Sequence, residues 1–180
     1  MVKRIIVLAG IIVASYAAYR IGQRIYTKSF SPEATSIAEI GSLKISINFS
    51  SPLKKARVIF ADNGLVPFGE VWRTGANEAT QIHLSTDVLV SGELLPAGDY
   101  ALFSIPGKDE WTIIFNKELN QWGSFTYDSS DDQLRIKVPS SNLEGPLESF
   151  GITLEQIGQG IDMSIAWDQT MVKVPFEIAN

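Results

Sequence analysis

The chain contains no cysteine. Disulfides, thiolate metal sites, cysteine nucleophiles and a lipid-modified N-terminal cysteine are therefore all excluded. The absence of cysteine does not distinguish an oxidising from a reducing compartment, because an exported domain of about 150 residues can fold on its hydrophobic core alone. A single globular domain of that size remains once the apolar N-terminal segment is set aside.

Histidine and basic residues are also scarce. His83 is the only histidine, and the net charge is −5 with a pI near 4.9. One histidine without the usual ligand spacings predicts no metal site, and no motif indicates a cofactor. Nucleic-acid binding is disfavoured because phosphate contacts need clustered basic residues. Several of the basic residues belong to the N-terminal segment: Lys3, Arg4, Arg20, Arg24 and Lys28.

The N-terminal segment carries the one long apolar run. Residues 5–19 contain no charge, and Arg20 follows them. Fifteen residues are short of the ~20 that cross a bilayer, but including residues 21–26 lengthens the apolar face, because Arg20 and Arg24 can extend to the interface. We therefore predict that residues 5–26 hold the protein in a membrane.

A cleaved signal peptide is the alternative for this segment. Basic residues precede the apolar run. Ser15-Tyr16-Ala17 then resembles a signal-peptide cleavage site, with small residues at its first and third positions. A buried soluble helix fits poorly, because the run is apolar on every face. Basic residues on both sides leave the orientation undecided by charge.

Beyond residue 30 the hydrophobic period is two, which indicates β-strands. Residues 100–105 and 111–115 are rich enough in apolar side chains to be buried on both faces. Turn residues separate the runs, including a hairpin loop at residues 106–109 and turns at residues 120–123 and 168–170. The alternating runs are residues 43–49, 81–90, 134–138, 163–167 and 172–178.

This pattern predicts an all-β fold, an antiparallel β-sandwich or barrel-like domain behind a single N-terminal hydrophobic helix. We divide the chain into a membrane anchor or signal segment at residues 1–26, a linker at residues 27–34, and the β-sandwich domain at residues 35–180.

The densest polar cluster occupies residues 72–80. A loop here could present Arg73, Asn77 and Glu78 to a ligand, with Arg73 suited to a carboxylate or another anion. The alternative is structural: Gly75 permits a tight turn, Asn77 caps it, and Arg73 pairs with Glu78 or a loop carbonyl. The sequence alone leaves both interpretations open.

His83 and Trp122 complete the candidate set. His83 shares the polar face of its strand with Gln81 and Ser85, which favours an exposed or structural histidine. Trp122 stands beside Gly123 in a turn, where its ring could stack on a sugar or an apolar ligand. The candidate ligand-binding residues are Trp72, Arg73, Asn77, Glu78, His83 and Trp122.

Three strings carry a resemblance to a known family: VPFGEVWRTGANEAT, LPAGDYALFSIPGKDEWTIIFN and NQWGSFTYDSSDDQLRIKV. With them the chain, from about Ser31 to its C-terminal VPFEI, resembles the family catalogued as domain of unknown function 2911. The resemblance implies an exported, periplasmic, β-rich domain of Bacteroidetes-type bacteria. The string WRTGANEAT is the hallmark of that family. The resemblance supplies no activity and no catalytic residue.

The leading functional hypothesis is a non-catalytic module at the inner membrane, facing the periplasm, that binds a small molecule, a glycan or a protein. One alternative is a hydrolase of a small envelope substrate with Glu78 or His83 as general base. Another is a structural subunit of a membrane complex. Cleavage of the segment would instead release a periplasmic or secreted protein.

Overall fold

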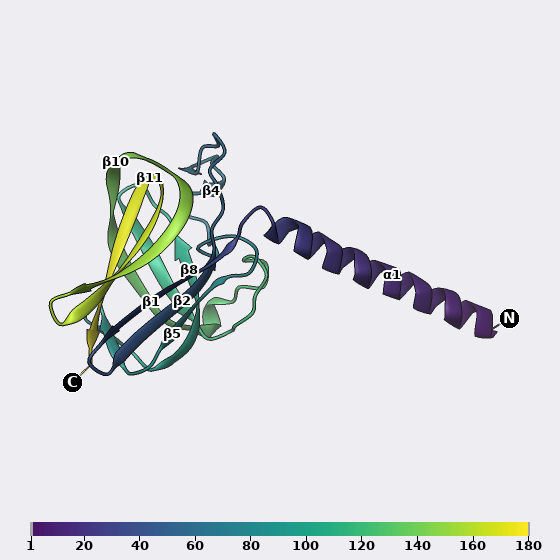
Figure 1. Ribbon diagram of the computed structural model, residues 1–180, viewed down its shortest axis with the longest axis horizontal. Coiled ribbons are helices and arrows are strands. Elements are labelled where there is room, and N and C mark those ends of the chain that lie inside the picture. The colour runs from purple at the N-terminus through teal and green to yellow at the C-terminus, as the bar shows by residue number, and fades with distance from the viewer. Residues whose placement is uncertain (1, 180) are drawn as a thin grey trace.

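The computed structural model describes residues 2–179, in which one helix, α1 (Val2–Lys28), extends away from a β-domain (Figure 1). A 3-10 turn at Ser129–Asp131 precedes β10. The strands are β1 (Glu33–Ile40), β2 (Leu43–Ser50), β3 (Phe60–Ala61), β4 (Val66–Pro67), β5 (Thr80–Leu84), β6 (Val88–Val90), β7 (Glu93–Leu95), β8 (Gly98–Ile105), β9 (Glu110–Asn116), β10 (Asp132–Ile157) and β11 (Gly160–Ile178).

Nine strands form one curled antiparallel sheet in the order β1-β2-β5-β8-β9-β10-β11-β6-β7, and β3 and β4 form a separate short parallel pair. The first part of β10 pairs with β9, and its later part pairs with β11. The sheet therefore folds into two layers, and β10 belongs to both. One layer contains β1, β2, β5, β8 and β9, and the other contains β11, β6 and β7. The sheet keeps two free ends, β1 and β7, so the predicted antiparallel fold is confirmed as a sandwich-like sheet rather than a closed barrel.

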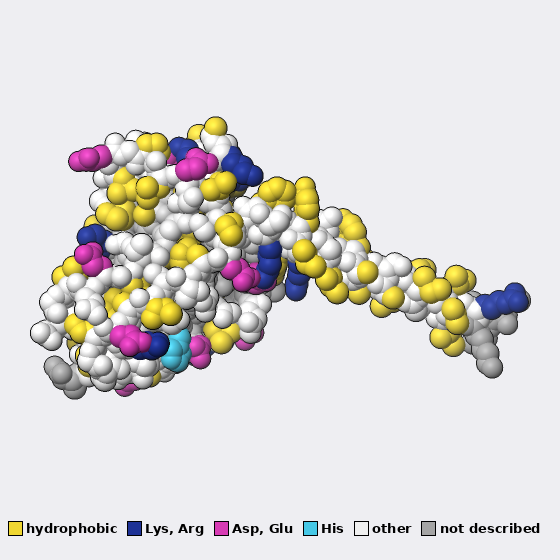
Figure 2. Space-filling view, in the orientation of Figure 1, with side chains coloured by type: hydrophobic (Ala, Val, Ile, Leu, Met, Phe, Trp, Pro, Cys, Tyr) yellow, Lys and Arg dark blue, Asp and Glu magenta, His cyan; other side chains and the backbone are white. Residues whose placement is uncertain are grey.

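Helix α1 lies outside the packed domain. Its described side chains are exposed along almost the whole length, and apolar side chains cover it in Figure 2. Ile6–Lys28 is long and apolar enough to cross a membrane. A signal sequence has the same properties.

The helix ends at Lys28, and β1 begins at Glu33, so the connection comprises residues 29–32 and is shorter than the predicted linker. Two polar side chains bond to carbonyl groups near the end of the helix. The Thr27 hydroxyl donates to the Arg24 carbonyl at 3.0 Å, and the Ser29 hydroxyl donates to the Tyr26 carbonyl at 2.7 Å.

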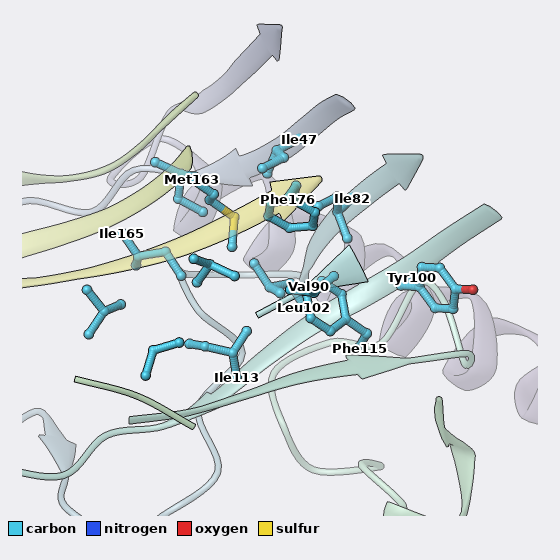
Figure 3. Close-up of a cluster of buried hydrophobic side chains, with 14 of the residues drawn as sticks. Ile47, Ile82, Val90, Tyr100, Leu102, Ile113, Phe115, Met163, Ile165 and Phe176 are labelled. Carbon is cyan, nitrogen blue, oxygen red and sulfur yellow. The ribbon is translucent and has the colours of Figure 1, made fainter. Parts of the chain in front are cut away.

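The core lies between the two layers and consists of the inward positions of the alternating strands (Figure 3). Strands β8 and β9 are buried on both faces, as predicted: Leu102 and Ile113 enter the main core, while Phe103 and Ile114 form a second cluster on the opposite face. These four side chains have no exposed surface. The labelled core residues in Figure 3 are Ile47, Ile82, Val90, Tyr100, Leu102, Ile113, Phe115, Met163, Ile165 and Phe176.

Two predictions about the strands were wrong. The run at residues 81–90 is not one strand: β5 pairs with β2 and β8, whereas β6 pairs with β11 in the other layer. The chain passes from one layer to the other between Leu84 and Val88. The alternation does not reveal this change, because both side chains are an even number of positions apart and face the same core. The turn expected at residues 168–170 is also absent: β11 runs through it, and Asp168 adopts φ 54° where the pairing register shifts. A β-bulge absorbs polar residues that resemble a turn.

We expect Ile113→Ala to lower the free energy of unfolding by about 2–5 kcal/mol, because it leaves a cavity in a site with no exposed surface. Chemical denaturation of the full chain in detergent, followed by tryptophan fluorescence, measures this. The matched control, Ile37→Ala, removes a side chain that is 56% exposed and should change stability by less than about 0.5 kcal/mol. Equal losses in both variants would contradict the assigned core.

Candidate functional site

A pocket of about 610 Å³ opens at the end of the domain from which α1 emerges. Its walls come from the helix end, the segment between β2 and β4, the loop at residues 72–80 and the turn at residues 120–125. Four of the six predicted site residues meet here: Trp72, Arg73, Asn77 and Trp122. The other lining residues are Thr27, Phe30, Ser31, Pro52, Leu53, Lys55, Arg57, Leu65, Val66, Gly75, Ala76, Gly123, Phe125 and Trp167.

The loop at residues 72–80 has an unusual backbone. Thr74 adopts φ 52°, Gly75 φ 151° and Asn77 φ 59°. A β-branched residue at positive φ costs on the order of 1–3 kcal/mol, so the surrounding structure must impose it. Gly75 cannot be replaced freely, because an added Cβ would lie 3.1 Å from the Ser50 carbonyl oxygen and 3.2 Å from the Thr80 hydroxyl oxygen.

Hydrogen bonds from buried groups hold this loop. The backbones of Trp72 and Ser104 exchange two bonds of 2.8 Å, and the indole Nε1 of Trp72 donates to the Gly75 carbonyl at 3.0 Å. The Thr80 hydroxyl donates to the Thr74 carbonyl at 2.6 Å. These bonds hold the loop against the end of β8 and fix the direction of its side chains.

Asn77 joins three segments instead of projecting freely. Its side-chain amide lies within hydrogen-bond distance of the Ser31 carbonyl and the Ser50 hydroxyl, at 3.4 and 3.3 Å. Its backbone carbonyl accepts from the amide of Gly123 at 2.9 Å. Asn77 is 6% exposed. It therefore connects the end of β2 and the turn at residues 120–123 to the floor of the pocket.

Arg73 is the charged group of this loop that lines the pocket. Its Nε atom is buried and has no hydrogen-bond partner among the described residues. The Arg73–Glu78 pair considered from sequence does not form, because the carboxylate of Glu78 pairs with Lys28 at 3.0 Å. Burial lowers the pKa of the Arg73 guanidinium, but an arginine side chain stays protonated at neutral pH. The pocket wall thus holds a partly desolvated positive charge.

Two more cations line the pocket, Lys55 and Arg57, and none of its described lining residues is acidic. Arg57 donates from Nε to the Lys54 carbonyl at 2.9 Å, which holds its side chain against the loop. Sequence reasoning missed both residues. The signal was there: the run Lys54-Lys55-Ala56-Arg57 is a basic cluster within an otherwise acidic domain.

Aromatic rings form the apolar part of the walls. Trp72 stacks on Trp167 with centroids 6.2 Å apart, and both are buried. Trp122 is half-buried, and the Arg24 guanidinium lies 4.9 Å from the centroid of its ring. Phe125 is 87% exposed at the rim. Positive charge and aromatic surface together suit an anion that carries an apolar or aromatic portion.

Glu78 and His83 lie outside this pocket. Glu78 borders a smaller cavity of about 230 Å³ beside Lys28 and β1. His83 projects from β5 with a side chain that is 49% exposed, and its Nδ1 lies 2.8 Å from the Asp99 carboxylate. The two groups suggested as general bases are therefore not in the main pocket, and the hydrolase interpretation gains nothing from their placement.

The family model for proteins of unknown function DUF2911 matches residues 31–176, which is most of the chain. The chain belongs to the DUF2911 family. No curated protein and no solved structure matches it. All pocket-lining residues except Thr27 and Phe30 fall inside the DUF2911 match, whereas α1 precedes it. The pocket is thus a feature of the DUF2911 domain, placed here beside an apolar helix.

We expect Gly75→Ala to lower the free energy of unfolding by about 1–3 kcal/mol, because alanine adds both positive-φ strain and contacts with Ser50 and Thr80. Thermal denaturation of the full chain in detergent measures it. Gly145→Ala is the control, since nothing lies within 4 Å of its added Cβ. A loop that tolerates Gly75→Ala as well as Gly145→Ala would not be fixed as described.

Proposed function

We propose that this DUF2911 domain is a non-catalytic binding module, held at the inner membrane by α1 and facing the periplasm, whose pocket binds a small anion with an apolar or aromatic portion. The single observation that carries the proposal is the position of Arg73, a partly buried charge that lines the pocket with no acidic residue among the described lining residues. A partly desolvated guanidinium without a carboxylate partner is stabilised when an anion binds beside it.

The remaining lining decides the class of anion. Lys55 and Arg57 add positive charge at the mouth, and none of the lining residues that the structure describes is an acid that could offset it. The half-buried ring of Trp122 and the exposed ring of Phe125 offer apolar surface beside the charge. A carboxylate or phosphate joined to an apolar group satisfies both parts, whereas a simple inorganic anion uses only the charged part.

The proposed location draws on two further features. The apolar helix is exposed along almost all of its described length, which leaves its surface for lipid. The resemblance to exported relatives supports placing the domain beyond the inner membrane. Cleavage of the helix as a signal would keep the pocket but release the domain into the periplasm.

The test is binding of phenyl phosphate and of octanoate to the full chain in nanodiscs, measured by isothermal titration calorimetry. We expect Arg73→Met to weaken binding by about tenfold to a hundredfold, the usual value of charge-assisted hydrogen bonds of 1.5–3 kcal/mol. Trp122→Ala should weaken phenyl phosphate more than octanoate, because a ring stacks on the indole.

Arg135→Met is the matched control. It removes an arginine of β10 that pairs with Asp132 and does not line the pocket, so it should leave both affinities unchanged. The neutral compound benzyl alcohol should bind more weakly than phenyl phosphate. Failure of both anions to bind the unmodified chain, or equal effects of Arg73→Met and Arg135→Met, would refute the proposed site.

A further inference from the structure

The rim of the pocket combines exposed apolar side chains with basic ones. Phe30, Leu53, Leu65 and Phe125 are 46%, 37%, 47% and 87% exposed. Exposed large apolar side chains gathered in one place usually mark an interaction surface. We name these four residues together with Lys55 and Arg57 the docking face. All six line the same pocket.

We propose that the docking face lies against an anionic lipid leaflet, so that the pocket opens at the level of the lipid headgroups. The inference rests on the proposed membrane insertion of α1 and adds an orientation of the domain that insertion alone does not require. A surface that pairs aromatic and leucine side chains with lysine and arginine is the usual composition of interfacial membrane contacts.

The length of α1 places the docking face near the bilayer surface. Its 27 residues extend about 40 Å at about 1.5 Å per residue, compared with a hydrocarbon core of about 30 Å. Arg4 and Arg24 are separated by about 30 Å on the same rise, so they fit the two interfaces of one bilayer. Tyr26 and Lys28 then lie in the headgroup region, where tyrosine and lysine are favoured.

A short series of contacts ties the helix end to the docking face. The rings of Tyr26 and Phe30 meet edge to face at 4.9 Å, and the Lys55 Nζ lies 5.0 Å from the centroid of the Phe30 ring. Arg24 lies over the ring of Trp122 on the other side. With only residues 29–32 between helix and strand, these contacts keep the pocket rim beside the membrane end of α1.

The charge distribution favours this face over the rest of the domain. The chain carries a net charge of −5, so most of its surface is repelled by anionic lipid. Lys55 and Arg57 line the docking face without a lining acid, and Figure 2 shows dark-blue side chains both above and below the point where the helix leaves the domain. A zwitterionic leaflet would offer only the apolar part of this attraction.

The absence of cysteine makes the test direct, because an introduced cysteine is the only thiol in the chain. Three full-length variants, Val13→Cys, Phe125→Cys and Ile157→Cys, each carry a fluorescent nitrobenzoxadiazole label. They are reconstituted in vesicles of phosphatidylglycerol and phosphatidylcholine that contain spin-labelled quencher lipids. All three native side chains are exposed, so labelling leaves the core intact.

Val13 reports insertion of α1, Phe125 reports the docking face, and Ile157 lies on the hairpin between β10 and β11, at the opposite end of the domain (Figure 1). We expect the labels at residues 13 and 125 to be quenched by lipid at least about twofold more than the label at residue 157. In vesicles of phosphatidylcholine alone, quenching at residue 125 should fall while quenching at residue 13 persists.

A charge reversal completes the design. Lys55→Glu in the Phe125→Cys chain should lower the ratio of docked to undocked domains on anionic vesicles by at least about tenfold, since one favourable positive charge is replaced by one unfavourable negative charge. Lys173→Glu makes the same change at an exposed position of β11 outside the docking face and should have little effect.

The outcomes separate the two proposals. If the label at residue 13 is not quenched, α1 is not inserted, and both the membrane anchor and the docking face are refuted. If residue 13 is quenched but residues 125 and 157 respond alike, the anchor stands and the docking proposal is overturned, which would leave the face for a protein partner. Equal effects of Lys55→Glu and Lys173→Glu would refute the role of the rim charge.

Discussion

The indole of Trp72 is the point at which the core and the candidate site depend on each other. Its ring packs against Trp167 and Phe150 inside the sandwich, and its Nε1 donates to the Gly75 carbonyl in the strained loop. The same buried side chain therefore stabilises both the packing between layers and the loop that directs Arg73 into the pocket. A candidate site built in this way is preformed, so binding of a ligand would require little ordering.

The fold was largely predictable because alternation of apolar residues reports directly which face of a strand is buried. The local pattern does not predict strand boundaries where pairing with distant strands determines them. It could not separate β5 from β6, whose inward residues keep the same spacing across a change of layer, and it mistook the bulge at Asp168 for a turn. Turn-forming residues and bulge-forming residues are chemically alike, and only the partner strand distinguishes them.

The sequence indicated part of the candidate site: four of the six predicted residues line the pocket, and two lie outside it. Trp72, Arg73 and Asn77 are neighbours in sequence, and Trp122 reaches them only because the turn at residues 120–123 pairs with the loop. Glu78 faces the opposite way and neutralises Lys28, a contact set by the position of the helix end. Whether a residue of this loop lines the pocket or the smaller cavity depends on the direction in which its side chain points. The order of residues in the sequence does not give that direction.

The connection through β1 also has a mechanical consequence. The chain of α1 enters the domain at Glu33, where the edge strand β1 pairs with β2 along its entire length, from Glu33–Ser50 to Ile40–Leu43. Ladder bonds between antiparallel strands run perpendicular to the chain. A tension applied to α1 along β1 is therefore shared by the whole ladder at once, whereas a tension across it opens the pairs one at a time. The ladder therefore resists a pull on α1 along β1 better than a sideways pull.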